Sequence, residues 1–287
     1  MKARSDPMKS IAWVTDSTCT IDPEFARDHH IYIVPLRLVF GDECYKETID
    51  ITNDEVYQKL ALHAKAGSSQ PPIGEFVELY ESLKDKYDEI IAIHCSSKLS
   101  GTYENSMQAA EMAEATVVGI DSNVGAFPLR EMILKGVELQ QQGHSALEIK
   151  EEIQNMIDHM EFFLIPANLQ QLHRSGRVSG TQLVISNLLK IHLIIRFDKG
   201  KIIVQDKIRT FKKAKQKLMD YMKVDVEKMK GICIMHANNI VEAKEIEKEI
   251  AVTSPHLKIE IMTFIPVVGI LAGEGTIGLS WINKYTK

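Results

Sequence analysis

The sequence has no run of about 18 apolar residues, so no transmembrane helix is expected. The amino-terminal segment MKARSDPMKS is polar and lacks the apolar core of a secretory signal peptide. Cysteine is scarce: Cys19, Cys44, Cys95 and Cys233 are scattered, and no two are spaced as C-x-x-C. Neither a zinc knuckle nor a disulfide framework is indicated. These absences together predict a cytoplasmic protein without an integral membrane segment.

Several motifs of catalysis are missing as well. The chain has no G-x-S-x-G elbow, no Walker A motif and no H-E-x-x-H. A dinucleotide-type pattern, Gly273-x-Gly275-x-x-Gly278, lies near the carboxyl terminus and is followed by a strand-like run instead of a helix. Because that context is wrong for a dinucleotide-binding βαβ unit, we expect no NAD site. Metals and cofactors are not expected either.

Composition and charge narrow the class of protein further. The chain has 287 residues, enough for one large domain or two ordinary ones. Its hydrophobic share of 45% and charged share of 25% are ordinary for globular proteins. The net charge of −5 argues against a nucleic acid partner, which needs a concentrated basic surface.

The first 160 residues alternate between strand-like and helix-like segments. Apolar β-branched runs such as SIAWVT and EIIAIHC read as strands, and IYIVPLRLVF reads as a strand interrupted by Pro35. Capping boxes at Thr52–Glu55 and Ser145–Glu148 mark two helix starts. GSSQPP, Gly67 to Pro72, reads as a loop. Strands alternating with helices predict parallel βαβ units.

The pattern changes after Met160. FFLIPA reads as a strand, HRSGRVSG as a basic glycine-rich loop, and TQLVISNLLK as a helix. IHLIIRFDKGKIIVQDKI then reads as a hairpin turning at Lys199-Gly200. We therefore predict an α/β protein of two domains: a parallel-sheet domain over 1–160, and an α+β domain with a mixed or antiparallel sheet over 161–287.

The most informative stretch is IAIHCSSKLSGTYENS, Ile91 to Ser106, in which a strand passes through a hydroxyl-rich turn into a helix. Ligands of open α/β sheets sit beyond the carboxyl ends of parallel strands. Free backbone N–H groups and small hydroxyls at a helix start can hold a carboxylate or phosphate. The alternative is that Ser100 only caps the helix beginning near Thr102. His94 and Cys95 are interpreted as a structural histidine and a buried thiol.

Several segments, taken in order, resemble the DegV family of bacterial fatty-acid-binding proteins over nearly the whole chain. The most specific is SSKLSGTY, Ser96 to Tyr103. The others are VTDST (Val14–Thr18), VPLRLVFGDECYKE, SSQPP (Ser68–Pro72), LHRSGRVSG (Leu172–Gly180) and IRTFKKA (Ile208–Ala214).

The resemblance implies a carrier that encloses one long-chain fatty acid, with the tail buried and the carboxylate near the domain interface. It also implies that a separate kinase subunit, related to dihydroxyacetone kinases, phosphorylates the bound carboxylate, while the carrier performs no catalysis. Carried over by position, the ligand-binding residues are Ser68, Ser69, Ser100, Gly101, Thr102, Arg177 and Arg209.

Apolar residues of the second half could line the acyl slot, although ordinary core packing is the alternative for each of them. These residues are Leu183, Ile185, Leu188, Leu189, Ile191, Ile194 and Phe264.

One departure from the family pattern concerns a histidine near the carboxyl terminus. Here the matching stretch is Leu271-Ala272-Gly273-Glu274-Gly275, so Leu271 stands where the family has histidine. Alternatives to the carrier therefore stay open. They are a lipid binder that no longer serves the kinase, a binder of another small anionic or phosphorylated ligand, and an enzyme using Ser100.

Overall fold

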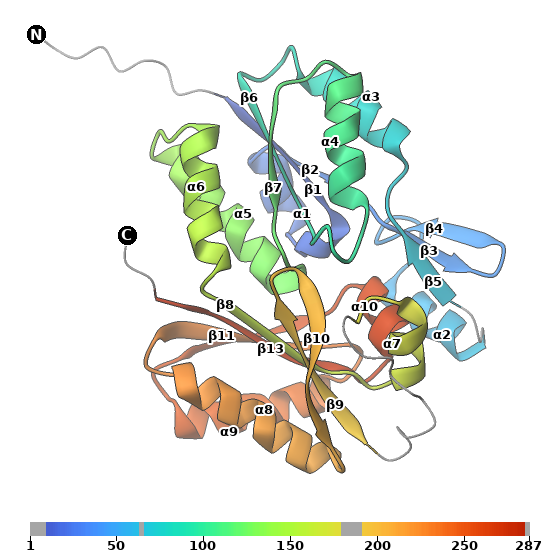
Figure 1. Cartoon of the computed structure of the whole chain (residues 1–287), viewed down its shortest axis with the longest axis vertical. Coiled ribbons are helices and arrows are strands. Elements are labelled where there is room, and N and C mark those ends of the chain that lie inside the picture. Colours follow the sequence, from blue (N-terminus) through green and yellow to red (C-terminus); the bar gives the residue numbers. More distant parts are fainter. Residues whose placement is uncertain (1–9, 63–65, 179–190, 285–287) are drawn as a thin grey trace, which may run out of the picture.

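Figure 1 shows the computed structural model of the chain, which describes residues 10–62, 66–178 and 191–284. Two separate sheets, each with its own helices, make up most of it, and strand β8 leads from the first to the second. Within these ranges, no helix combines the length and the hydropathy that crossing a bilayer requires.

The first half is built on a four-stranded parallel sheet with the order β2-β1-β6-β7. The strands are β1 (Ile11–Asp16), β2 (Ile31–Val34), β6 (Glu89–His94) and β7 (Val117–Asp121). Strands β1 and β6 are buried over nearly their whole length, which explains their continuous apolar sequences. Because the strands are parallel, Asp16, His94 and Asp121 end at one edge of the sheet.

Helices cover both faces of this sheet (Figure 1). On one face Trp13 and Ile91 pack against Leu129 and Ile149, and on the other Ala92 packs against Phe76. The covering helices are α1 (Pro23–Asp28), α5 (Ala126–Gln141) and α6 (Ala146–Ile157) on the first face, and α3 (Ile73–Leu83) and α4 (Thr102–Met112) on the second.

Both predicted capping boxes are present. The Glu148 carboxylate accepts a hydrogen bond from the Ser145 N–H at 2.8 Å, and the Ser145 hydroxyl accepts one from the Glu148 N–H. Thr52 and Glu55 make the same reciprocal pair before α2 (Asn53–Leu62). Each box satisfies backbone donors that a helix start leaves free.

A small antiparallel sheet with the order β4-β3-β5 stands beside the parallel sheet. Its strands are β3 (Arg37–Phe40), β4 (Glu43–Lys46) and β5 (Ala66–Ser69). The break at Pro35 between β2 and β3 was predicted. The loop prediction for Gly67–Pro72 is wrong at its start, because Gly67 to Ser69 pair with β3. Four residues without apolar alternation carry no strand signal of their own.

The second half forms a six-stranded mixed sheet with the order β10-β9-β8-β13-β11-β12. All pairs are antiparallel except β11 with β12. The strands are β8 (Met160–Ile165), β9 (His192–Asp198), β10 (Lys201–Ile208), β11 (Met229–His236), β12 (Lys258–Thr263) and β13 (Ile277–Asn283). Helices α8 (Phe211–Asp225) and α9 (Ile240–Thr253) cover one face through an apolar core. The predicted hairpin at Lys199-Gly200 is confirmed.

Two short helices on the other side of this sheet were not predicted. Helix α7 (Leu169–Ser175) includes His173 to Ser175, so the loop predicted for HRSGRVSG is wrong at its start. The Asn168 side chain caps its start, and Gly176, with a φ of +70°, ends it. Helix α10 (Pro266–Ala272) has the sequence PVVGILA, which is too short and uniformly apolar to show helical periodicity. The helix predicted for TQLVISNLLK lies outside the described residues.

The predicted class, α/β with a parallel sheet first and a mixed sheet second, is confirmed. Sheet membership changes at β8, which begins at Met160. The division into domains 1–160 and 161–287 stays a prediction, because Ile265, Val267 and Ile270 share a core with Leu38 and Val56 of the first half.

Candidate functional site

An apolar pocket lies where residues of both sheets, the small sheet and helices α7 and α10 converge. It contains about 900 Å³ of space between its walls, including the part open to solvent. Its lining residues are Thr18, Leu36, Ser68, Ser69, Cys95, Leu99, Ser100, Val124, Gly125, Ala126, Phe162, Leu164, Leu172, Ser175, Arg177, Ile195, Phe197, Ile202, Phe264, Ile265, Val267, Val268, Leu271 and Ala272.

Three phenylalanine rings form part of the apolar wall. Phe162 and Phe197 are stacked with ring centroids 4.5 Å apart and an interplanar angle of 7°. Phe264 is a second neighbour of Phe162, with ring centroids 6.4 Å apart. Ile195 and Ile202 from the β9–β10 hairpin line the same pocket. Such a wall suits an apolar ligand, because it offers no hydrogen-bonding groups.

The predicted acyl-slot residues are distributed unevenly around this pocket. Phe264 lines it, and Ile191 is half-buried in the surrounding cluster. Ile194 instead faces the core under α8. Neighbouring residues of a strand point to opposite faces, so Ile195 and Phe197 reach the pocket where Ile194 cannot. Leu183, Ile185, Leu188 and Leu189 lie outside the described residues.

The two serine-containing loops lie side by side at the pocket. The Gln70 side chain packs directly over Gly101, where an added Cβ would lie 3.2 Å from the Gln70 Nε2 atom. The Asn105 side-chain amide donates to the Pro71 carbonyl at 3.1 Å. These contacts hold the segment after Ser69 against the start of α4, so hydroxyls from both loops line one pocket.

Ser100 does not cap helix α4. The capping position is occupied by Gly101, and no side chain makes a capping hydrogen bond there. The Ser100 hydroxyl lies 2.8 Å from the Thr102 hydroxyl and lines the pocket, whereas Gly101 and the fully buried Thr102 do not. The capping alternative for Ser100 is therefore wrong. Its hydroxyl is therefore available to a ligand in the pocket.

Arg177 is the one charged side chain that lines the pocket among the described residues. Its Nε donates to the Leu99 carbonyl at 3.2 Å, and its Nη1 donates to the Ser175 carbonyl at 2.9 Å. It has no carboxylate partner in the described part of the chain. Burial lowers the pKa of Arg177 from its usual value, but a guanidinium stays charged in proteins. The pocket therefore contains a cation without an acidic partner.

Arg209, the other predicted arginine, lies elsewhere. It is exposed in the turn between β10 and α8 and does not line the pocket. Arg209 therefore does not contact a ligand held inside this pocket. A role on the surface stays a prediction.

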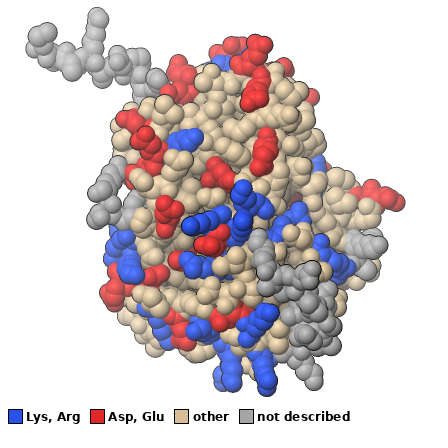
Figure 2. All heavy atoms as spheres, viewed as in Figure 1, with Lys and Arg blue, Asp and Glu red and all other residues tan. Residues whose placement is uncertain are grey.

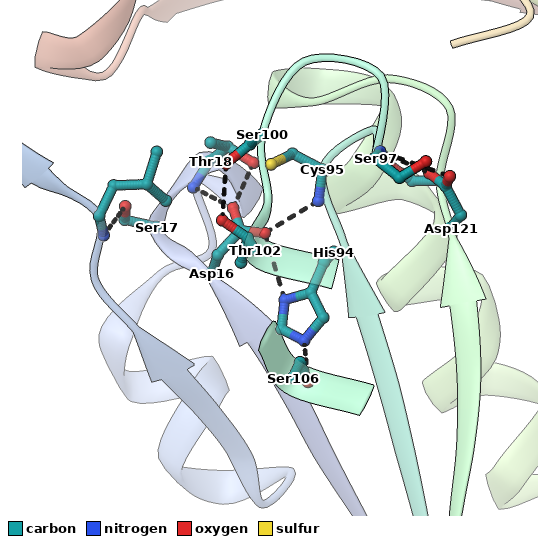
Figure 3. Close-up of polar contacts among 12 residues, drawn as sticks. Asp16, Ser17, Thr18, His94, Cys95, Ser97, Ser100, Thr102, Ser106 and Asp121 are labelled. Atoms are coloured by element: carbon teal, nitrogen blue, oxygen red, sulfur yellow. Dashed lines mark hydrogen bonds and ion pairs between the residues drawn. The ribbon is translucent and has the colours of Figure 1, made fainter. Parts of the chain in front are cut away.

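A buried polar network lies directly behind the pocket wall (Figure 3). The Asp16 carboxylate accepts hydrogen bonds from the Thr18 N–H at 3.0 Å, the Thr18 hydroxyl at 2.5 Å and the Cys95 N–H at 2.8 Å. Its other partner is the His94 Nδ1 atom at 3.3 Å, and His94 Nε2 lies 2.8 Å from the Ser106 hydroxyl. Asp16 thereby joins the loop after β1 to the loop after β6.

The same network explains why the ring nitrogens of His94 are satisfied and why Cys95 is a buried thiol, as the sequence predicted. His94 is fully buried with both ring nitrogens paired. Burial raises the pKa of the Cys95 thiol well above its usual range, and the Asp16 charge adds to the effect. A thiol held protonated is a poor nucleophile. The Asp16–His94 contact itself was missed, because parallel strand ends are adjacent in space but 78 residues apart in sequence.

The tip of the β9–β10 hairpin closes over the loop after β6. The Ser96 hydroxyl donates to the Gly200 carbonyl at 2.7 Å. Gly200 is buried with a φ of +82°, and a Cβ there would lie 2.8 Å from the Ser96 hydroxyl and 2.9 Å from the Asn123 side-chain oxygen. The hairpin that provides Ile195 and Ile202 is therefore fixed to the serine loop at its tip.

Glu47 connects the loop after β1 to helix α10, whose residues line the pocket. It is fully buried, accepts from the Ser17 hydroxyl at 2.5 Å and accepts from the Val267 N–H at 2.7 Å. Burial raises the pKa of Glu47 to about 7, with a further contribution from Asp16, although the bonds from Ser17 and Val267 favour the ionised form.

Glu47 should make the protein less stable as the pH rises from about 5 to about 8. Its pKa in the folded protein is above the ordinary value of 4.5, so the folded state binds the proton more tightly. The resulting stabilisation is complete below the ordinary pKa and is lost as the pH rises through about 7. The Glu47→Gln variant should therefore gain stability over the unmodified protein between these pH values, by at most about 3 kcal/mol. Urea unfolding of both proteins at both pH values measures this, and parallel pH dependence would contradict it.

No group of three or more His, Cys, Asp or Glu residues suited to a metal ion occurs in ranges 10–62, 66–178 and 191–284. Among the residues that the structure describes, those lining the pocket include no carboxylate and no imidazole. What it offers is a long apolar wall, hydroxyls of Ser68, Ser69 and Ser100, and one guanidinium. This combination suits a molecule with an apolar body and one anionic end.

Comparison with known proteins agrees with the fold. The family model described as "Uncharacterised protein, DegV family" matches residues 10–284. Protein DegV of Bacillus subtilis is 36% identical over 282 residues, covering 96% of this chain and 100% of that protein. A DegV domain-containing protein of Halalkalibacterium halodurans is 35% identical over 279 residues, covering 96% of this chain and 99% of that protein.

Solved structures of DegV family proteins also match this fold. The crystal structure of DegV, a fatty acid binding protein from Bacillus subtilis, matches with a TM-score of 0.87 at 35% identity, covering 96% of this chain and all of that one. A fatty acid binding DegV family protein from Streptococcus agalactiae matches with a TM-score of 0.89 at 24% identity over 96% of this chain and 100% of that one, which supports the fold alone. With a family model spanning nearly all of its residues and a relative above one-third identity over its length, this chain belongs to the DegV family.

Proposed function

We propose that this protein binds one long-chain fatty acid, with the tail in the apolar pocket and the carboxylate near Arg177, Ser68 and Ser100. The observation that carries the proposal is the pocket itself. It is lined almost entirely by apolar side chains, and its one charged lining residue in the described part of the chain is an arginine without an acidic partner.

The energetics of such a ligand fit this arrangement. Each buried CH₂ group contributes about 0.8 kcal/mol, so a long tail can supply most of the binding free energy. A carboxylate taken out of water needs a counter-charge and hydrogen-bond donors. Arg177 provides the first, and the Ser68, Ser69 and Ser100 hydroxyls provide the second. The fatty acid binding described for DegV of Bacillus subtilis supports the same function.

A binding role is favoured over catalysis. No Asp, Glu or His lines the pocket in the described ranges, so Ser100 has no general base beside it. Ser106, His94 and Asp16 do form a serine–histidine–carboxylate chain, but all three are fully buried, and the Ser106 hydroxyl also contacts the Tyr80 hydroxyl at 2.6 Å. A substrate cannot reach that serine without unfolding the wall.

A kinase subunit related to dihydroxyacetone kinases is the partner that we propose for the loaded protein. An exposed basic strip at the start of α8, defined by Arg209, Lys212 and Lys213, is a candidate docking surface for it. Figure 2 shows Lys and Arg side chains along the lower edge of the molecule, where Figure 1 places α8. Such a strip suits an acidic partner surface.

Leu271 should affect how efficiently the kinase phosphorylates the bound fatty acid. It lies in α10 and lines the pocket, in the position where the family pattern has histidine. Leucine cannot donate to a head group, so we expect the unmodified protein to support acyl-phosphate formation weakly. Leu271→His should raise kinase-dependent turnover more than it changes fatty-acid affinity. Turnover of the unmodified protein equal to that of a carrier with the histidine would disprove this.

A different small anionic or phosphorylated ligand is the second candidate. The arginine and the hydroxyls would serve phosphate equally well. Against it stands the apolar wall of Phe162, Phe197 and Phe264, which a small polar ligand would leave unused.

Native mass spectrometry of protein purified from cells separates these candidates. The proposal predicts a mass increment of one fatty acid per chain, which organic extraction removes and added fatty acid restores. A bound phosphorylated small molecule would support the second candidate. Repeated preparations with no acyl species and no uptake of added fatty acid would disprove the carrier function.

Ser100→Ala should weaken fatty-acid binding with little change in stability. A hydrogen bond to a charged group contributes about 1.5–3 kcal/mol, so Kd should rise about tenfold or more. Thermal stability should change little, because Gly101 and not Ser100 occupies the cap of α4. Ser97→Ala is the matched control, since Ser97 is in the same loop but does not line the pocket. Equal affinity of both variants would contradict a role for the Ser100 hydroxyl.

A further inference from the structure

Two carboxyl groups lie behind the part of the wall that contains Thr18. Asp16 and Glu47 are both fully buried, and they are close enough for the Asp16 charge to contribute to the raised pKa of Glu47. Thr18 and Cys95, which bond to Asp16, themselves line the pocket. A fatty-acid carboxylate at Ser100 would therefore bring a further negative charge toward a site that is already acidic.

The hydrogen bonds around Asp16 favour its ionised form. It receives the Thr18 N–H, the Thr18 hydroxyl and the Cys95 N–H, and three donors to one carboxylate stabilise the anion. Burial opposes ionisation, but the contacts with His94, Thr18 and Cys95 outweigh it and hold the pKa of Asp16 below its usual range. Asp16 is thus a fixed negative charge one residue layer behind the pocket.

His94 lies on the far side of Asp16 from the pocket. Its Nδ1 faces the Asp16 carboxylate at 3.3 Å, and its Nε2 faces the Ser106 hydroxyl at 2.8 Å. Both partners can accept a hydrogen bond: the Asp16 carboxylate is an acceptor, and the Ser106 oxygen has two lone pairs, so it can accept from His94 while it also contacts the Tyr80 hydroxyl at 2.6 Å. The surroundings therefore accommodate an imidazolium with both nitrogens donating. The Phe76 ring packs edge-on with the His94 ring, and the two ring centroids are 5.4 Å apart.

We infer that His94 and Asp16 form a neutral ion pair, and that the His94 charge is what allows an anionic head group to bind in front of Asp16. Without the His94 charge, the ligand carboxylate would face Asp16 with Arg177 as the one compensating cation among the described residues that line the pocket. At several ångströms and in a partly buried setting, an unscreened like charge weakens binding by an order of magnitude or more. This inference rests on the proposed function. It adds that the head-group site favours an anionic ligand over a neutral one of the same length.

The test compares a charged ligand with a neutral one of the same length. Delipidated protein is titrated with palmitate and with hexadecanol, both delivered from cyclodextrin. In the His94→Asn variant an amide can still donate to Asp16, but the charge is gone. Palmitate affinity should fall about tenfold or more relative to the unmodified protein, whereas hexadecanol affinity should change by less than about threefold.

Ser106→Ala keeps the ring but removes the acceptor at His94 Nε2. It should therefore weaken palmitate binding in the same sense as His94→Asn but to a smaller extent, with hexadecanol affinity changed by less than about threefold. Equal losses of palmitate and hexadecanol binding in His94→Asn would overturn the inference and leave the fatty-acid carrier intact. An unmodified protein that binds neither ligand would overturn both.

A second measurement needs no variant. Nitrogen-15 NMR of the palmitate-loaded, unmodified protein at neutral pH should show His94 with both ring nitrogens protonated. A neutral His94 ring in the loaded protein would overturn the inference even if the variant failed to fold.

Discussion

Replacing Arg177 by methionine should raise the Kd for a long-chain fatty acid about a hundredfold. The change removes the one charged side chain that lines the pocket in the described ranges, while keeping an apolar stem of similar length. Charge-assisted hydrogen bonds to a carboxylate, together with the cost of burying that carboxylate unpaired, amount to about 3 kcal/mol. Displacement of a fluorescent fatty acid, measured on delipidated protein, reports the change.

Arg174→Met is the matched control for this variant. Arg174 lies three residues earlier, is exposed on α7 and does not line the pocket. It should bind fatty acid as the unmodified protein does. Because Arg177 also donates to the Leu99 and Ser175 carbonyls, thermal unfolding of each variant must be recorded. A correctly folded Arg177→Met protein with unchanged affinity would show that the carboxylate binds elsewhere.

Gly200→Ala should destabilise the protein by about 2–5 kcal/mol. The left-handed φ of +82° costs an alanine about 1–2 kcal/mol. The new Cβ would also lie 2.8 Å from the Ser96 hydroxyl and 2.9 Å from the Asn123 side-chain oxygen, and forcing these groups apart adds about 1–3 kcal/mol. Loosening the hairpin tip from Ser96 should also speed fatty-acid release, since the hairpin forms part of the pocket wall.

Gly143→Ala isolates the backbone part of this effect. Gly143 has a φ of +90° and is exposed, and an added Cβ would meet no atom within 4 Å. The difference between the two variants in urea unfolding therefore measures the crowding at the hairpin tip. Equal destabilisation of both, with unchanged fatty-acid release, would mean that the contact between Gly200 and Ser96 has no mechanical role.

Much of the fold could be predicted from the sequence because its signals are local. The apolar run that became β1 and the reciprocal pair at Ser145 and Glu148 each determine structure over a few residues. Strand β5 could not be predicted in this way, because Ala66 to Ser69 are held in a sheet by pairing with β3 and not by their own preference. Helix α10 escaped prediction for a similar reason, since its environment and not its periodicity fixes it.

The candidate site was predictable only where hydroxyl-rich loops mark it. Ser68, Ser69, Ser100 and Arg177 were named from motifs, and the structure brings all four to one pocket. The rest depends on contacts between distant segments. Phe162 and Phe197 stack across 35 residues of sequence, and Glu47 bonds to the backbone of Val267 across 220. No local sequence pattern predicts contacts between residues so far apart in the chain.

A crystal structure of the protein with an ω-brominated long-chain fatty acid tests the central claim most directly, because anomalous scattering locates the end of the tail without ambiguity. We predict one ligand per chain, with its carboxylate within hydrogen-bonding distance of Arg177 and the Ser100 hydroxyl. Its bromine should lie inside the pocket, among the apolar side chains around Phe162 and Phe264. A bromine outside this pocket, or a carboxylate directed away from Arg177, would contradict the account.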